Sequence, residues 1–469
     1  MKQDFITYIQ ETFKFSKKEM TDFELALSKP LWKSIRINTN KISVEDFKSI
    51  ADENNWTLTE SGLWKNMFYI DRENTSLALG NTLEHINGYF YIQEVAASSS
   101  PYYMSWDIVD TNPYLILDMS ASPGWKTTEL AEYYPNSLIV ANEIDKARLK
   151  WLFINLDRMW SENVVCTNYD GRFFKQTWEI FDKVLLDAPC SGEGTSFKTD
   201  DALRYWNLKN IKRIAKLQFG LLEAAVKSTK VWGEIIYSTC TLNTLENEQI
   251  VEKILKKYVG IVEIENLNPE AWLWKKIKKS LSLNSGVNVW ENCIRAWPHK
   301  NNTGWFFVTK LIKTASLEED LKNIEKVKQG FEKIPSKDVK QIKSYLADRF
   351  DFDVSSYNFS MYREEVYMTS KSLDNLWERF FFKKTWVKIG TLKSSEYIPN
   401  FYVGTLSPFK KWTIDISDEI LDTLFKGGSL DSDLSDGYYQ ALYKNHPAGM
   451  CKVKNGKLES LVESSFIRG

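Results

Sequence analysis

The sequence has few cysteines and histidines, and neither sign of charge is in clear excess. Its five cysteines form no CxxC pair, which argues against a disulfide framework or a zinc site and indicates a reducing compartment. The three histidines, His85, His299 and His446, show no spacing typical of metal ligands. We therefore expect no bound metal ion.

Long apolar runs are also absent. No stretch of about 18 apolar residues occurs, so we expect no membrane-spanning helix. The first twenty residues carry charges throughout and lack the apolar core of a signal peptide, which favours a cytoplasmic location. The formal net charge is only -1, so any affinity for nucleic acid must come from local basic patches.

Residues 234–248 contain the first candidate for a functional site. This stretch reads EIIYSTCTLNTLENE, a short apolar run that predicts a buried strand, then a loop, then a helix. The strand ends just before Cys240. In an α/β sheet, ligands bind in the crevice beyond the strand ends. Taken alone, however, most free cysteines are small buried hydrophobes.

A second strand also ends close to a cysteine. Residues 183–194 read KVLLDAPCSGEG, and a helical pattern over residues 210–230 separates this strand from the first. A strand, a helix and a strand in this order form a right-handed crossover with the two strands parallel. Adjacent strands lie ~4.8 Å apart, so we expect Cys190 and Cys240 to emerge side by side, with Asp187 beside them.

A third stretch, residues 114–132, reads YLILDMSASPGWKTTELAE and predicts a strand, a turn at Pro123-Gly124 and a helix. It is not a phosphate-binding P-loop, because Met119 occupies the position of the first glycine and Trp125 separates Gly124 from Lys126. The following strand ends at Glu143, where nucleoside-binding folds carry the carboxylate that binds ribose hydroxyls.

These motifs resemble those of the bacterial 16S rRNA cytosine-C5 methyltransferases, which use S-adenosylmethionine. The segments DMSASPGWKT, DAPCSGEG and YSTCTLNTLENE carry the resemblance, together with the N-terminal segments RINT and GYFYIQE. It covers about the whole catalytic core. Residues 388–406, Ala448-Gly449 and 465–468 are, more loosely, similar to the PUA-like tail of that family.

The resemblance implies a fold and a domain order. We expect an α/β protein with a Rossmann-like class I methyltransferase domain, a small N-terminal α+β domain and a C-terminal PUA-like region. The expected boundaries are 1–95 for an N-terminal RNA-binding domain, 96–314 for the methyltransferase domain, 315–380 for a helical linker or small domain, and 381–469 for a PUA-like RNA-binding domain. Within this scheme, residues 93–104 read as a serine-rich joint and residues 401–403 as a strand. We expect a monomer.

The resemblance also implies the role of each site residue. Cys240 is the nucleophile that adds to C6 of cytosine, Cys190 acts in product release, Asp187 binds the cytosine edge, and Lys126 assists there. The residues expected to bind S-adenosylmethionine are Asp118, Ser120, Ala121, Ser122, Pro123, Gly124, Trp125, Lys126, Glu143, Arg148, Asp170 and Asp187. Arg36 and Asn38 are expected to contact RNA.

Two departures from the family pattern bear on function. Trp125 stands where relatives have a small residue, and Ser120 replaces a frequent cysteine. A bulky Trp125 leaves open a second class of function, an RNA-binding ribosome assembly factor without cofactor. Among enzymes, tRNA is the alternative substrate to rRNA. A DNA methylase fits less well, because those enzymes attack with the Pro-Cys thiol and do not need Cys240.

Overall fold

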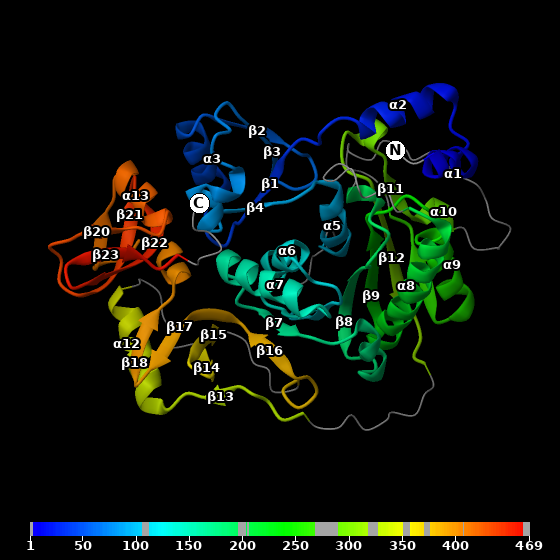
Figure 1. Ribbon diagram of the computed structural model, residues 1–469. Helices are drawn as coiled ribbons and strands as arrows, with labels where there is room; N and C mark the ends of the chain where they lie inside the picture. The colour runs from blue at the N-terminus through cyan, green and yellow to red at the C-terminus, as the bar shows by residue number, and fades with distance from the viewer. Residues whose placement is uncertain are drawn as a thin grey trace.

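The computed structural model describes residues 3–105, 112–195, 203, 206–267, 289–317, 327–349, 357–369, 376–406 and 408–462. Figure 1 shows a central sheet flanked by helices. In this view the small N-terminal sheet lies above helices α6 and α7, and the two C-terminal sheets lie at the left and lower left. Within these residues, no helix combines the length and the apolar character needed to cross a bilayer.

The N-terminal region contains two parts with different packing partners. Helices α1 (Gln3–Phe13) and α2 (Lys17–Leu27) pack on the catalytic domain, where Phe5 contacts Trp206 and Trp305. A four-stranded antiparallel sheet follows, in the order β2-β3-β1-β4. Ser43 caps helix α3 (Val44–Glu53) by accepting a hydrogen bond from the Asp46 amide. The other elements are β1 (Ser34–Ile37), β2 (Trp56–Glu60), β3 (Met67–Arg72), α4 (Leu83–Ile86) and β4 (Phe90–Ile92).

The central sheet has the order β10-β12-β9-β8-β5-β6-β7-β16, with β11 paired to β12. Strands β7, β6, β5, β8 and β9 are parallel. The bounds are β5 (Leu115–Asp118), β6 (Leu138–Asn142), β7 (Val164–Thr167), β8 (Phe181–Asp187), β9 (Thr229–Thr239), β10 (Val262–Glu265), β11 (Ile294–Ala296) and β12 (Phe306–Lys313). The prediction of a Rossmann-like α/β fold is confirmed.

Helices cover both faces of this sheet, so its strands are apolar on both sides. One face packs against α5 (Ser99–Ser105), α6 (Trp125–Tyr133) and α7 (Lys146–Met159), and the other against α8 (Leu208–Ser228) and α9 (Glu248–Lys257). The chain builds β5, β6 and β7 outward and then returns to β8 on the other side of β5. This change of direction places a crevice at the carboxyl ends of β5 and β8, where ligands bind in such folds.

Three local predictions were wrong. The expected joint at residues 93–104 contains the buried helix α5, which packs against the sheet. Residues 315–380, expected to form a helical linker or a small domain, are not a purely helical linker: their described part contains one long helix, α12 (Ser336–Arg349), along with β13 (Glu332–Lys333) and the hairpin β14 (Asn358–Tyr362) and β15 (Glu365–Thr369). Residues 401–403 lie in a 3-10 helix, Phe401–Thr405, rather than a strand.

The C-terminal region starts inside the catalytic sheet. Strand β16 (Phe382–Thr385) pairs with β7, and after Trp386, whose φ is 58°, β17 (Val387–Lys393) pairs with β15. Lys384 on β16 forms a buried ion pair of 2.7 Å with Asp157 of α7. The positive φ of Trp386 changes the direction of the backbone, so the chain passes from the central sheet to the next sheet within a few residues.

The two C-terminal sheets are β13-β14-β15-β17-β18 and β19-β21-β22-β23-β20. Their remaining elements are β18 (Glu396–Pro399), β19 (Thr413–Asp415), α13 (Asp418–Phe425), β20 (Ser429–Asp431), β21 (Gly437–Tyr443), β22 (His446–Lys454) and β23 (Lys457–Ser460). The second sheet packs against α4 of the N-terminal region. The PUA-like assignment stays a prediction, and residues 465–468 lie outside the described residues.

Candidate active site

The two predicted cysteines meet at the carboxyl ends of β8 and β9. These strands are parallel neighbours with Asp187 opposite Ser238, so the loops that follow them start side by side. The sulfur atoms of Cys190 and Cys240 lie 3.1 Å apart. Both side chains are partly exposed, whereas Cys166 and Cys451 are buried. The predicted proximity of the two thiols is therefore confirmed.

A buried carboxylate, Glu193, holds the loop that follows Cys240. It accepts hydrogen bonds from the backbone amides of Leu242 (2.7 Å) and Asn243 (3.1 Å), and from the indole of Trp206 (2.7 Å). The Gly194 amide also donates to the Cys240 carbonyl at 2.7 Å. The segment after Cys190 thus fixes the position of Cys240. The sequence analysis did not single out Glu193, although it lies within one of the quoted motifs.

A second buried carboxylate, Glu246, joins the two cysteine loops. It accepts hydrogen bonds from the Ser191 amide (2.9 Å), the Gln218 amide group (2.8 Å) and the Asn243 amide group. Gln218 of α8 also donates to the Pro189 carbonyl at 3.0 Å. Both loops are therefore held by side chains whose rotamers are fixed by packing, as a preorganised site requires.

The Cys190 thiol is held in its protonated form. The hydrogen bond with Cys240 and, second, burial raise the pKa of Cys190 well above the ordinary thiol value. A thiolate is the nucleophilic form of cysteine, so Cys190 is a poor nucleophile in this arrangement.

Lys126 and Asp187 form an ion pair beside the thiols. The ammonium group of Lys126, whose side chain is only 5% exposed, contacts the Asp187 carboxylate, and Ser238 donates a hydrogen bond of 2.8 Å to the same carboxylate. The ammonium also lies 4.1 Å from the centroid of the Trp125 ring, a cation–π geometry. Lys126 is therefore a buried member of the site rather than a surface residue, and Trp125 supports it.

The turn between β5 and α6 is shaped by Gly124. Its φ is 107°, and a Cβ there would lie 2.9 Å from a Leu152 methyl group. Side chains of α7 hold the rest of the turn, with Arg148 donating to the Ser122 carbonyl at 2.6 Å and Asn155 donating to the Pro123 carbonyl at 2.9 Å. This turn is therefore rigid, and it opens into the crevice at the end of β5.

Asp118, the last residue of β5, is almost fully buried. Burial raises its pKa to about 7, although the Thr127 hydroxyl donates a hydrogen bond of 2.6 Å to it. This carboxyl therefore holds its proton to a much higher pH than an ordinary aspartate does. Its contact with Thr127 ties the end of β5 to the first turn of α6, which carries Lys126.

Two further acidic residues follow β6 and β7. Glu143 is 2% exposed and lies 3.6 Å from the Arg148 guanidinium. Asp170 accepts a hydrogen bond of 3.0 Å from Arg172, and this bond is the main interaction that lowers the pKa of Asp170. Carboxylates at the ends of successive parallel strands suit the ribose and adenine of S-adenosylmethionine, so these residues fit the cofactor. Their individual contacts stay predictions.

Comparison with known proteins decides the family. The model for 16S rRNA methyltransferase RsmB/F matches residues 108–312, and the model for the N-terminal domain of 16S rRNA methyltransferase RsmF matches residues 1–95. The ribosomal RNA small subunit methyltransferase F of Shewanella baltica strain OS223 is 32% identical over 100% of this chain and 97% of its own length. The chain belongs to the 16S rRNA methyltransferase RsmB/F family.

Other relatives agree with this assignment. The ribosomal RNA small subunit methyltransferase F of Shewanella piezotolerans is 36% identical over 91% of this chain and 88% of its own length. A methyltransferase homolog from Pyrococcus horikoshii has a TM-score of 0.53 and 27% identity, and covers 67% of this chain and 100% of that chain. The RsmB/F protein described here is an S-adenosylmethionine-dependent RNA methyltransferase.

A second solved structure, NSun6 from Pyrococcus horikoshii with SFG, has a TM-score of 0.56 at 22% identity, and covers 67% of this chain and 99% of that chain. At that identity it supports the shared fold only.

Two predicted RNA-binding residues of this RsmB/F protein require correction. Arg36 is fully buried, pairs with Glu132 and donates a hydrogen bond of 2.8 Å to Thr128, both on α6. Asn38 is 1% exposed and donates to the Gly88 and Met159 carbonyls. Neither side chain can reach RNA in this structure. Arg36 joins the N-terminal sheet to α6 by neutralising the buried Glu132 carboxylate, and Asn38 joins it to the end of α7 through the Met159 carbonyl.

Proposed function

We propose that this RNA methyltransferase transfers a methyl group from S-adenosylmethionine to C5 of a cytidine in 16S rRNA. The Sγ–Sγ distance of 3.1 Å between Cys190 and Cys240 at the strand ends carries the proposal, because covalent activation of a pyrimidine needs one sulfur to attack and a second group to complete release. The names of the curated relatives support rRNA of the small subunit as the substrate.

The chain's residues perform the covalent chemistry in a definite order. Cys240 adds to C6, forming a C–S bond and making C5 electron-rich. Asp187, held by Lys126 and Ser238, binds the cytosine edge. S-adenosylmethionine supplies the methyl group as an electrophilic sulfonium. Afterwards C5 loses a proton, the electron pair of that C–H bond restores the C5–C6 double bond, and the C–S bond breaks with its electron pair returning to the Cys240 sulfur as a thiolate.

The contact between the thiols suggests how Cys190 becomes a base at the right stage. In the free protein the Cys240 sulfur is the largest cause of the raised pKa of Cys190. Once Cys240 is bonded to C6, its sulfur is a neutral thioether and accepts a hydrogen bond only weakly. Cys190 then loses its proton to solvent more readily and can accept the proton from C5.

Bisulfite sequencing of rRNA and tRNA from a strain that lacks the gene tests the substrate. Loss of one 5-methylcytidine in 16S rRNA is expected, and loss of a tRNA mark with rRNA unchanged would reject the proposal. Calorimetry with S-adenosylmethionine separates the enzyme from an assembly factor, which would give no binding heat. Action in the cytoplasm, as a monomer and without a metal ion, stays a prediction.

A further inference from the structure

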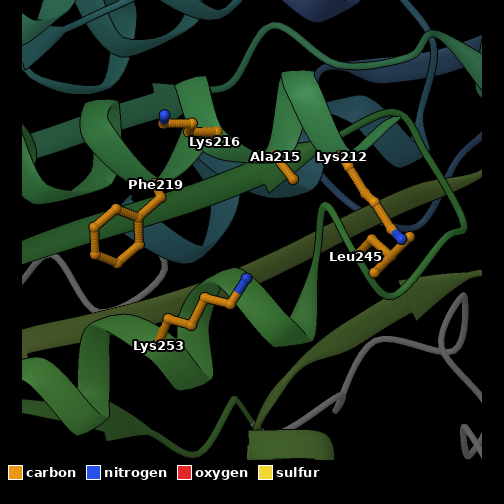
Figure 2. A pocket seen from close by; sticks show the side chains of 6 residues that line it. All are labelled: Lys212, Ala215, Lys216, Phe219, Leu245 and Lys253. Carbon is orange, nitrogen blue, oxygen red and sulfur yellow. The ribbon is translucent and has the colours of Figure 1, made fainter. Parts of the chain in front are cut away.

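A cavity of about 620 Å³ lies between helices α8 and α9, and three lysines line it (Figure 2). The four lining residues of α8 follow the spacing i, i+3, i+4, i+7, which places them on one face of that helix. Lys253 comes from α9 and Leu245 from the loop before it. The lining residues, called here the basic pocket, are Lys212, Ala215, Lys216, Phe219, Leu245 and Lys253.

The charges of the basic pocket are not neutralised within the described part of the chain. None of the three lysines lies within 4.0 Å of a carboxylate among the described residues. The carboxylates of α8 and α9 have other partners: Glu223 pairs with Lys257, Glu252 with Lys256, and Glu248 with Arg295. The basic pocket is therefore a local positive site on a protein whose formal net charge is -1.

The basic pocket shares its wall with the cysteine loops. Leu245 precedes Glu246, which accepts a hydrogen bond of 2.9 Å from the Ser191 amide. Gln218, which lies between Lys216 and Phe219 on α8, donates to Glu246 and to the Pro189 carbonyl. A ligand in the basic pocket would thus lie against the same loops that position Cys190 and Cys240.

We propose that the basic pocket binds the phosphate backbone of the RNA substrate beside the target cytidine. This inference rests on the proposed function and names the surface that holds the RNA next to the reacting base. Three ammonium groups without a carboxylate partner among the described residues suit phosphate oxygens, and Phe219 and Leu245 offer apolar contact to a sugar or an unstacked base. Net charge cannot attract RNA to this protein, so a local site of this kind is required.

The test combines Lys212→Gln, Lys216→Gln and Lys253→Gln in one protein. Its control replaces Lys230, Lys256 and Lys257 by Gln, since these exposed lysines are already paired with carboxylates. Filter binding of unmodified 16S rRNA transcript between 50 and 200 mM salt should show affinity at least tenfold weaker for the first variant only. The slope of log affinity against log salt should fall by about 2, because each single-strand phosphate contact contributes ~0.7.

Three further measurements separate binding from catalysis and from misfolding. The KM for RNA should rise by the same factor as the binding constant, while kcat at saturating RNA and calorimetric affinity for S-adenosylmethionine stay within about twofold. Acetylation of the unmodified protein with and without transcript, read by mass spectrometry, should show protection of the three pocket lysines. No protection, or equal salt slopes in both variants, would overturn the inference.

A different result would contradict the proposed function itself: the unmodified protein would transfer no methyl group to 16S rRNA. A fall in kcat of the pocket variant at unchanged KM would also count against a phosphate-binding role.

Discussion

The sulfur atoms of Cys190 and Cys240 lie 3.1 Å apart, although the two residues are 50 positions apart in the sequence. Parallel pairing of β8 and β9 brings their loops together, and the buried carboxylates Glu193 and Glu246 fix the distance. Each thiol is thus held in place by side chains that belong to the other thiol's loop. This reciprocal arrangement is the basis of the catalytic predictions.

Replacement of each cysteine should give opposite results. Cys240→Ala removes the sulfur that bonds to C6, so turnover and covalent capture should both be lost. Cys190→Ala removes the group that completes release, so the protein should remain bound to RNA as a slowly migrating adduct on a denaturing gel. Cys451→Ala, a buried cysteine far along the chain, serves as the control. If Cys240→Ala formed the adduct and Cys190→Ala lost covalent capture, Cys190 would be the nucleophile and Cys240 the group that completes release.

Alkylation should distinguish the same two thiols without mutation. Iodoacetamide reacts with thiolates, and the pKa of Cys190 is raised well above its ordinary value by its contact with Cys240 and by burial. At pH 7.5 we expect Cys240 to be modified at least tenfold faster than Cys190, as read from peptide masses over time. Burial raises the pKa of Cys166 and of Cys293, so these should be slow as well. Faster labelling of Cys190 would contradict the assignment.

Gly124→Ala should weaken binding of S-adenosylmethionine. The residue needs a φ of 107°, and its Cβ would contact Leu152 at 2.9 Å, so the turn should shift at a cost of about 1–3 kcal/mol. Calorimetry should show roughly tenfold weaker affinity. Gly260→Ala is the matched control, because Gly260 also has a positive φ but has nothing within 4 Å of its Cβ position. Equal affinities of both variants would argue against the turn as a cofactor site.

Arg36→Met should lower stability and leave RNA affinity unchanged. It would leave Glu132 buried without its cationic partner, and breaking a buried ion pair costs about 3–5 kcal/mol. Urea denaturation should therefore show a lower midpoint. Arg363→Met, at an exposed arginine, should change the midpoint little. Weaker RNA binding by a fully folded Arg36→Met protein would restore the role expected from the sequence.

Asp118 should make stability depend on pH. Its pKa is about 7 in the folded protein, against an ordinary value of 3.8, so between these values the folded state binds the proton more tightly than the unfolded state. Its contribution is complete below pH 4 and is lost as the pH rises through 7. Asp118→Asn cannot titrate but can still accept the Thr127 hydrogen bond, so its melting temperature should fall less between pH 5 and 8.

Glu129, whose pKa burial also raises to about 7, is present in both proteins, so the difference between them isolates Asp118. Parallel melting curves of the two proteins across this pH range would show that the carboxyl does not titrate there.

Much of the site could be predicted because it lies at strand ends. An apolar run of strand length, a helical repeat and a second run predict one crossover with a fixed hand, and this places Asp187, Cys190 and Cys240 at one edge. The family resemblance added the chemistry that the pattern alone left open. Glu193 and Glu246 were within the quoted motifs, but a carboxylate's partners depend on which loop it meets in space.

Besides the local errors at residues 93–104, 315–380 and 401–403, the wrong predictions concern contacts between segments distant in the sequence. Arg36 looks like a surface arginine until the N-terminal sheet packs on α6 and places Glu132 against it. Residues 382–385 join the catalytic sheet because β7 leaves an edge that they complete. The sequence by itself determined the parallel strands and crossover helices around the site and the two thiols at the strand ends, since local periodicity and the hand of crossovers depend on nearby residues. Only the tertiary structure decided which charges are buried and which loops hold the thiols, because burial and pairing depend on segments that meet after folding.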